Sequence, residues 1–314
     1  MRFALMIEPQ QGCSYLDQLA IARRAEAAGF ETLYRSDHYT SFPGESDRPT
    51  TDAWTVVAGL ARETSRIRLG VLVSPVTFRA PGTLAKIVTT VDEMSGGRID
   101  VGVGAGWNEV EHRQHGLPFP PIETRAEMLE ETLAILRGLW CEPDGWSFEG
   151  RHWSVQGARF RSRSPQQPAP AIIVGGEGSP RSMRLAARYA DEFNLTSASP
   201  ERAGERFALL DEACRAAGRD PATLRRSVMT GVLVGRDRVE VDDRWARLMA
   251  GFGVADGADW LAQRRPRWIA GTPDEARAVV GRFAAAGAER LVLQDFLPWD
   301  LDLVDLLGET LLGG

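Results

Sequence analysis

Two adjacent side chains that can exchange protons, Asp37 and His38, follow a short apolar run near the start of the chain. The run Thr32–Ser36 predicts a β-strand with Asp37 and His38 at its carboxyl end. A carboxylate beside an imidazole can fix the tautomer of the ring and raise its pKa. A histidine placed in this way can donate or accept a proton during a reaction. The alternative is a capping aspartate and a structural histidine in a loop, and spacing alone does not decide between the two.

A second candidate site is a glycine-rich turn that follows the apolar run Ala171–Val174. Glycines permit a tight turn with its amides pointing inward. Ser179 is a natural N-cap, and Pro180 suits the first position of a helix. Free amides at a helix N-terminus bind phosphate, and Arg181 adds positive charge. We therefore predict a phosphate site, with an ordinary strand-to-helix turn as the alternative; its residues are Gly175, Gly176, Glu177, Gly178 and Ser179.

A third candidate is the glycine corner Gly102–Gly106, which precedes Trp107 and Asn108. It is weak evidence for a dinucleotide fold, because Trp107 stands where the fingerprint needs its third glycine. Glycines there would let the backbone approach a flat ring or a neighbouring strand. Asn108 could hydrogen-bond a ring edge or a phosphate. The strand Ile67–Val73 ends at Ser74, which could line the same site or simply begin a turn.

Four residues after this corner raise the question of a metal site, namely Glu109, Glu111, His112 and His115. Their spacing makes them neighbours on a helix, but the HEXXH pattern of zinc enzymes is absent. We therefore predict solvated charges there and no metal.

Composition limits the class of protein. The chain has 314 residues, 43% of them hydrophobic and 25% charged, as is usual for a globular enzyme. No apolar run approaches the roughly 20 residues of a membrane span. The net charge of −6 argues against a nucleic-acid surface. The N-terminal residues Met1–Ile7 are typical of a first strand and not of a secretion signal. Three widely spaced cysteines suggest neither a disulfide framework nor a metal site, so we expect a protein of the reducing cytoplasm.

Apolar runs and helical patterns alternate along the whole chain. Eight strands are predicted at Phe3–Ile7, Thr32–Ser36, Ile67–Val73, Ile99–Val103, Ala171–Val174, Glu192–Leu195, Ser227–Val234 and Arg290–Gln294. Eight helices are predicted at Tyr15–Ala28, Thr51–Glu63, Pro81–Met94, Thr124–Leu139, Pro180–Ala190, Ala203–Ala217, Pro273–Ala286 and Leu301–Leu312. This alternation predicts one (β/α)8 TIM-barrel domain over residues 1–314. A doubly wound open sheet is the alternative, but it would need a phosphate fingerprint after the first strand.

Four connections are longer than a barrel needs: Tyr39–Pro49, Trp107–Ile122, Cys141–Pro170 and Gly235–Gly271. Long connections in a compact fold are usually lids, binding loops or subunit contacts. Three of them follow strands and should crowd the catalytic mouth. Cys141–Pro170 precedes a strand, and its aromatic residues alternate with polar ones as in a small hairpin.

Together these motifs resemble the bacterial-luciferase-like superfamily, and specifically its deazaflavin-dependent oxidoreductases, which use coenzyme F420. The resemblance rests on Ser36-Asp37-His38, Val71–Phe78, Ser95–Arg98, Gly102–Glu109 and Val174–Gly178. It implies a (β/α)8 barrel with four insertions, usually a homodimer, with a tricyclic ring at the barrel mouth and its phosphate tail in the Gly175–Gly178 turn.

The resemblance also implies roles for individual residues. It implies a non-prolyl cis peptide under the ring, which we expect at Val71-Leu72. Ser74 and Asn108 would hydrogen-bond the cofactor, beside Gly106 and Trp107. Trp107 stands where sugar-phosphate dehydrogenases of the family carry a glutamate, which puts that activity in doubt.

Three functions follow as hypotheses. The first is an F420-dependent oxidoreductase that transfers hydride between deazaflavin and a small organic substrate. In it His38 donates the proton, Asp37 orients His38, and Glu109 is the second candidate donor. The second is an FMN-dependent monooxygenase served by a separate reductase, and the third is a non-catalytic flavin-binding protein. We expect neither nucleic acid nor membrane as a partner.

Overall fold

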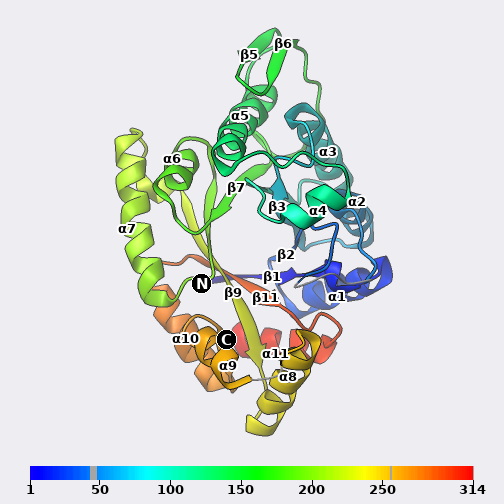
Figure 1. The fold of residues 1–314 in the computed structure, drawn as a ribbon, viewed down its shortest axis with the longest axis vertical. Helices are drawn as coiled ribbons and strands as arrows, with labels where there is room; N and C mark the ends of the chain where they lie inside the picture. Colours follow the sequence, from blue (N-terminus) through cyan, green and yellow to red (C-terminus); the bar gives the residue numbers. More distant parts are fainter. Residues whose placement is uncertain (43–47, 255–256, 314) are drawn as a thin grey trace.

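Eight parallel strands close into a barrel in the computed structural model, which describes residues 1–42, 48–254 and 257–313 (Figure 1). Each strand pairs with the next around the barrel, and the register β1–β11 closes it from Arg2↔Arg290 to Ile7↔Asp295. All eight predicted strands are present, so the barrel is confirmed and the open sheet is wrong. In barrel order they are β1 (Arg2–Ile7), β2 (Thr32–Arg35), β3 (Arg68–Pro75), β4 (Ile99–Gly104), β7 (Ala171–Gly176), β8 (Glu192–Thr196), β9 (Arg225–Val234) and β11 (Arg290–Asp295).

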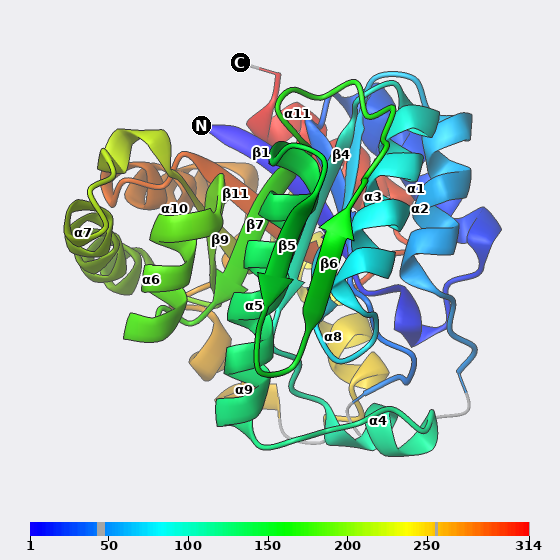
Figure 2. The same ribbon diagram turned by 90° about the horizontal axis from the view of Figure 1, so that it is seen from above.

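A ring of eight helices packs around the barrel, and each contacts the next (Figure 2). They are α1 (Tyr15–Ala28), α2 (Ala53–Glu63), α3 (Pro81–Ser95), α5 (Ile122–Cys141), α6 (Pro180–Tyr189), α7 (Pro200–Ala216), α10 (Pro273–Ala285) and α11 (Leu301–Leu311). Local sequence sets their ends. In α1 the N-cap Ser14 and Asp17 form a capping box, and Gly29 ends the helix with a φ of 90°. The predicted helices are therefore all confirmed, with ends shifted by up to three residues.

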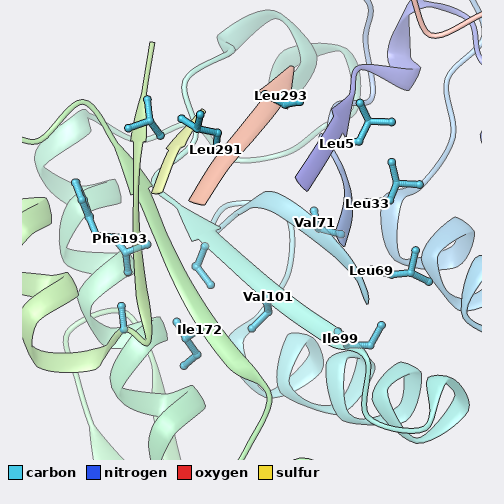
Figure 3. Packing of buried hydrophobic residues seen from close by; sticks show 14 of the residues in the cluster. Leu5, Leu33, Leu69, Val71, Ile99, Val101, Ile172, Phe193, Leu291 and Leu293 are labelled. Atoms are coloured by element: carbon cyan, nitrogen blue, oxygen red, sulfur yellow. The ribbon is translucent and has the colours of Figure 1, made fainter. Parts of the chain in front are cut away.

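The hydrophobic core has two layers because strand side chains alternate between two faces. In β1, Phe3, Leu5 and Ile7 point outward into the main core between barrel and helices, where Leu33, Val101 and Phe193 also lie (Figure 3). Residues of the opposite parity fill the barrel interior as a smaller cluster of Ala4, Met6, Tyr34, Leu72, Ile173 and Val292. The barrel interior is thus a packed core, and the ligand sites of such barrels lie at the carboxyl ends of the strands.

The predicted insertions carry the elements that the alternating pattern does not require. The connection after β4 contains α4 (Glu109–Gln114), and the segment before β7 forms the expected antiparallel hairpin of β5 (Trp146–Glu149) and β6 (Ser154–Ala158). The connection after β9 contains α8 (Arg238–Gly251), α9 (Gly257–Arg264) and the short strand β10 (Ile269–Gly271), which pairs with β9. Residues 43–47 and 255–256 of two predicted insertions lie outside the described residues. Within the described ranges, no helix has both the length and the apolar character to cross a bilayer.

Candidate active site at the barrel mouth

The candidate site residues come from four strands that are neighbours in the barrel. In the order β2, β3, β4 and β7, their carboxyl ends carry His38, Ser74, Gly104 and Gly175. Ligand sites of parallel barrels lie at this end of the strands. The fold therefore brings together motifs that are up to about 140 residues apart in the sequence.

The end of β3 is irregular. Its register to β4 is regular up to Val71↔Val101 and resumes at Ser74↔Val103, so Leu72 and Val73 lie between two paired segments. The non-prolyl cis peptide lies there, at Leu72-Val73. The expected position at Val71-Leu72 is wrong by one residue, because Val71 still belongs to the regular ladder. The Val71 side chain is also fully buried in the core facing the helices, whereas Leu72 and Val73 pack with the cluster in the barrel interior.

The glycine corner makes room for this irregular segment. A Cβ on Gly104 would lie 2.5 Å from Val73 Cγ2, and a Cβ on Gly175 would lie 2.9 Å from Val73 Cγ1. A Cβ on Gly102 would lie 2.6 Å from the carbonyl oxygen of Val71. Of the two uses predicted for these glycines, close approach of a neighbouring strand is therefore the one that the structure contains.

His38 is held by a residue other than the predicted one. Its Nδ1 lies 3.0 Å and 3.2 Å from the two carboxylate oxygens of Glu111 in α4. Trp107 and Phe42 cover the imidazole edge-on, at ring distances of 5.5 Å and 4.7 Å. The side chain is 13% exposed, so one edge of a mostly buried ring reaches the mouth.

Asp37 turns away from His38 and pairs with Arg79. The two groups form a salt bridge in which the Asp37 side chain is fully buried. Arg79 also pairs with Asp52, the N-cap of α2, and donates to the hydroxyl of Tyr39 at 3.0 Å. Burial raises the pKa of Asp37 above its ordinary value, although Arg79 acts in the opposite direction. The prediction that Asp37 orients His38 is therefore wrong. After β2, the Asp37 side chain contacts Arg79 in the connection after β3, and the His38 side chain contacts Glu111 of α4.

Helix α4 also corrects the prediction of solvated charges. Glu111 and His112 are 1% and 0% exposed, whereas Glu109 and His115 are exposed. His112 Nδ1 lies 2.6 Å from the carbonyl oxygen of Asn108, so it must donate, and Nε2 lies 2.6 Å from the hydroxyl of Thr77. Three of the four residues lie in α4 and His115 is its C-cap, but Glu111 and His112 are enclosed because α4 packs against the connections after β2 and β3. Among the described residues, no group of three or more potential ligands is arranged to hold a metal ion.

Other predicted residues already have partners within the protein. Ser74 is 1% exposed and accepts a hydrogen bond of 2.9 Å from the indole of Trp54. Asn108 caps α4 by accepting from the amide of Val110 at 3.2 Å. Gly106 has a φ of 80°, which turns the chain into Trp107, and the Trp107 side chain is 62% exposed. Trp107 is therefore available to a ligand. The Ser74 and Asn108 side chains already accept hydrogen bonds within the protein, so a ligand would have to share these oxygens with Trp54 and Val110.

The predicted phosphate turn borders a pocket of about 320 Å³ between α5 and α6. Its polar lining consists of Gly175, Ser179, Ser182, Arg181 and Glu123, and its apolar residues include Ala105, Ile122 and Leu185. Ser179 caps α6 by accepting from the amide of Ser182 at 3.1 Å, and Gly178 has a φ of 80°. Gly176 is half-buried and Glu177 is exposed. The structure thus brings Gly175 and Ser179 to the same cavity as the glycine corner.

These residues fit a flavin-like cofactor. An elongated ligand with an apolar ring and an anionic arm needs an apolar wall next to a helix N-terminus. The pocket offers that combination, with Ser179 and Ser182 at the helix N-terminus, Arg181 adding positive charge and Glu123 adding negative charge. The pocket reaches the carboxyl ends of β4 at Ala105 and of β7 at Gly175, and Gly175 lies against Val73 of β3.

A polar cluster at the same mouth escaped the sequence analysis. Glu8, the residue that follows β1, accepts hydrogen bonds from the side-chain amides of Gln10 at 2.8 Å and Gln294 at 2.5 Å. Ser36 donates to Gln10 at 2.7 Å. The alternation of β1 would have placed Glu8 inside the barrel with Ala4 and Met6, which is the pattern that could have identified it.

The chain belongs to the luciferase-like monooxygenase family, whose model matches residues 1–297. Relatives over most of the chain include an uncharacterised protein of Mycobacterium tuberculosis, which is 32% identical over 85% of this chain and 92% of its own length. An F420-dependent glucose-6-phosphate dehydrogenase of Amycolatopsis mediterranei is 28% identical over 88% of this chain and 87% of its own.

Solved structures share the fold. An F420-dependent secondary alcohol dehydrogenase, solved with an F420-acetone adduct, superposes with a TM-score of 0.85 at 21% identity, covering 99% of this chain and 98% of that one. A monooxygenase of Streptomyces bottropensis superposes with a TM-score of 0.83 at 24% identity, covering 100% and 99%. At these identities the likeness concerns the fold alone.

Proposed function

We propose that this protein is an F420-dependent oxidoreductase, which transfers a hydride between the deazaflavin and a small organic substrate at the barrel mouth. The observation that carries the proposal is the pocket at the N-terminus of α6, which combines an apolar wall with Ser179, Ser182 and Arg181. Membership of the luciferase-like family supports it, as do relatives that are named for F420 dependence. Bound deazaflavin would supply hydride exchange.

The protein's own residues would bind the cofactor, orient its ring and exchange a proton with the substrate. The turn Gly175–Ser179 would hold the phosphate through main-chain amides, and Leu72 and Val73 would lie beneath the ring. His38 would donate or accept the proton that accompanies hydride transfer, because its imidazole follows the carboxyl end of β2 and is 13% exposed. Trp107 and Phe42 cover His38 and would keep water from it.

An FMN-dependent monooxygenase is the second candidate. It is favoured by membership of the luciferase-like monooxygenase family. The same pocket and turn would serve FMN, because both cofactors carry a tricyclic ring and a phosphate. A homodimer, a small-molecule substrate and a single domain over residues 1–314 stay predictions.

Titration of the purified full chain with F420 and, separately, with FMN tests the proposal, with cofactor fluorescence and absorbance as readouts. We expect saturable F420 binding that is tighter than FMN binding. Tight FMN binding without F420 binding, together with oxygen consumption in reduced FMN, would favour the monooxygenase instead. Binding of neither compound would contradict both functions.

The role of His38 needs a variant that keeps the binding site. His38→Ala should retain F420 affinity within about threefold, because the phosphate turn lies on other strands, and should lose 10²–10⁴-fold in turnover. Unchanged turnover of any substrate that the wild-type protein accepts would remove His38 from the reaction.

A further inference from the structure

Glu111 is a buried carboxylate with two donors converging on it. Its side chain is 1% exposed. Both oxygens lie within hydrogen-bond distance of His38 Nδ1, at 3.0 Å and 3.2 Å, and Oε2 also accepts from the backbone amide of Tyr39 at 3.0 Å. Glu111 is therefore the hydrogen-bond acceptor of both groups.

This geometry defines which nitrogen of His38 carries a proton. A nitrogen that faces a carboxylate donates to it, so Nδ1 stays protonated whether the ring is neutral or charged. The proton that His38 gains and loses is then the one on Nε2. Fixing a tautomer through the second ring nitrogen is a known way to aim the first at a reaction partner.

The charges around His38 favour its protonated form. Burial lowers the pKa of His38, but the hydrogen bond and the charge of Glu111, together with the charges of Glu8 and Asp37, more than offset burial, so the pKa lies above the ordinary value. Glu8, at the end of β1, and Asp37, in the same loop, act in the same direction with smaller effects. The effect of Asp37 is limited because Arg79 pairs with it.

We propose that Glu111 is the positioning residue of His38: it holds the Nδ1–H tautomer, and Nε2 becomes the nitrogen that exchanges a proton with the substrate. The inference deepens the proposed function, because the exchange itself depends on that function. The tautomer and its dependence on Glu111 do not depend on it, so the two can be tested apart.

The chain offers a matched control on the same helix. His112, the residue after Glu111, ties α4 to the β3 connection through Thr77, as Glu111 ties α4 to the β2 connection. Thr77→Val removes one of these two attachments with little change in shape. If Glu111 acted only by anchoring α4, losing the Thr77 attachment should disturb His38 in a similar way.

The test is a pH titration of the full chain labelled with ¹⁵N-histidine, followed by NMR. The chain has four histidines, and the His38 signals are assigned by their loss in His38→Gln. Wild-type His38 should show the Nδ1–H tautomer when neutral. In Glu111→Gln the pKa of His38 should fall by about one to three units, and both tautomers should be populated. In Thr77→Val both properties should match the wild type.

Two results would overturn the inference. One is an Nε2–H tautomer in the neutral wild-type protein, a measurement that does not depend on the folding of Glu111→Gln. The other is a folded Glu111→Gln protein in which the pKa and tautomer of His38 are unchanged. If His38 titrates as expected but the protein binds neither F420 nor FMN, the proposed function fails while the Glu111–His38 coupling stands.

Discussion

Individual buried charges in this protein differ in how completely they are paired. Asp37 has Arg79, and Glu111 has His38 and the amide of Tyr39. Asp295, the last residue of β11, has fewer hydrogen-bond partners and, within the described part of the chain, no paired cation. It is fully buried, Oδ1 accepts from the amide of Leu297 at 2.7 Å, and Oδ2 has no partner among the described residues. An ionised carboxylate in such a place is unfavourable, and burial raises the pKa of Asp295 to about 7.

This pKa predicts a specific dependence of stability on pH. An aspartate in the unfolded chain has a pKa of about 3.9. Because the folded-state pKa is higher, the contribution of Asp295 to the free energy of unfolding is fully present below about pH 4. It is lost as the pH rises towards about 7. In Asp295→Asn this loss should disappear, so the variant should gain on the wild type by up to about 1.4 kcal/mol per unit of pKa difference.

Urea unfolding at a series of pH values between 4 and 8 measures this effect. Asp274→Asn is the control, because the Asp274 side chain is 96% exposed. Parallel stability curves for wild type and Asp295→Asn would show that Asp295 does not titrate in this range.

At the scale of elements, two helices begin in the same way but have different surroundings. Helices α6 and α7 both start with serine at the N-cap and proline at the first position. Ser179 accepts from the amide of Ser182 at 3.1 Å, and Ser199 accepts from the amide of Arg202 at 3.3 Å. Only Ser179 is among the residues that line the pocket at the glycine turn.

This pair predicts separable effects on stability and on binding. Ser179→Ala and Ser199→Ala should each lower the free energy of unfolding by about 1 kcal/mol, because each loses an N-cap. Only Ser179→Ala should weaken cofactor binding, by about threefold to tenfold, since it alone alters the proposed phosphate turn. Thermal unfolding and the F420 titration measure the two effects. Equal loss of affinity in both variants would show that the turn binds no ligand.

Sequence patterns predicted the repeating elements much better than the contacts at the site. Strands such as Ile99–Val103 and helices such as Tyr15–Ala28 were predictable because alternation, caps and glycines are local. The partner of His38 was not, because Glu111 lies 73 residues away and reaches it only through the fold. Helix α4 is not among the eight helices predicted from the alternating pattern, because its six residues are too few for a period to stand out. The position of the cis peptide likewise depended on the register of β3 with β4.

At the scale of the whole molecule, the barrel has opposite ends of different character. The mouth holds the candidate site, while the other end of the interior contains a charged network around Arg290. Arg290 is 1% exposed and pairs with Glu192 of β8 at 3.0 Å and with Glu31 at 3.3 Å. It also donates to Tyr34 of β2 at 2.7 Å, and Tyr34 donates to Asp100 of β4 at 2.8 Å. One side chain of β11 thus connects strands on several sides of the barrel.

Removing Arg290 should therefore destabilise the barrel as a unit. Arg290→Met leaves buried carboxylates with fewer cations, and breaking a buried pair by removing one partner costs about 3–5 kcal/mol. Arg282→Met is the control: its pair with Glu201 is exposed at 54% and 65%, and such pairs contribute less than about 1 kcal/mol. Urea unfolding should show a lower midpoint for Arg290→Met with an unchanged slope, because the closed sheet unfolds cooperatively. A midpoint equal to that of Arg282→Met would mean that Arg68 and Arg225, which also pair with Asp100 and Glu192, suffice to balance these carboxylates.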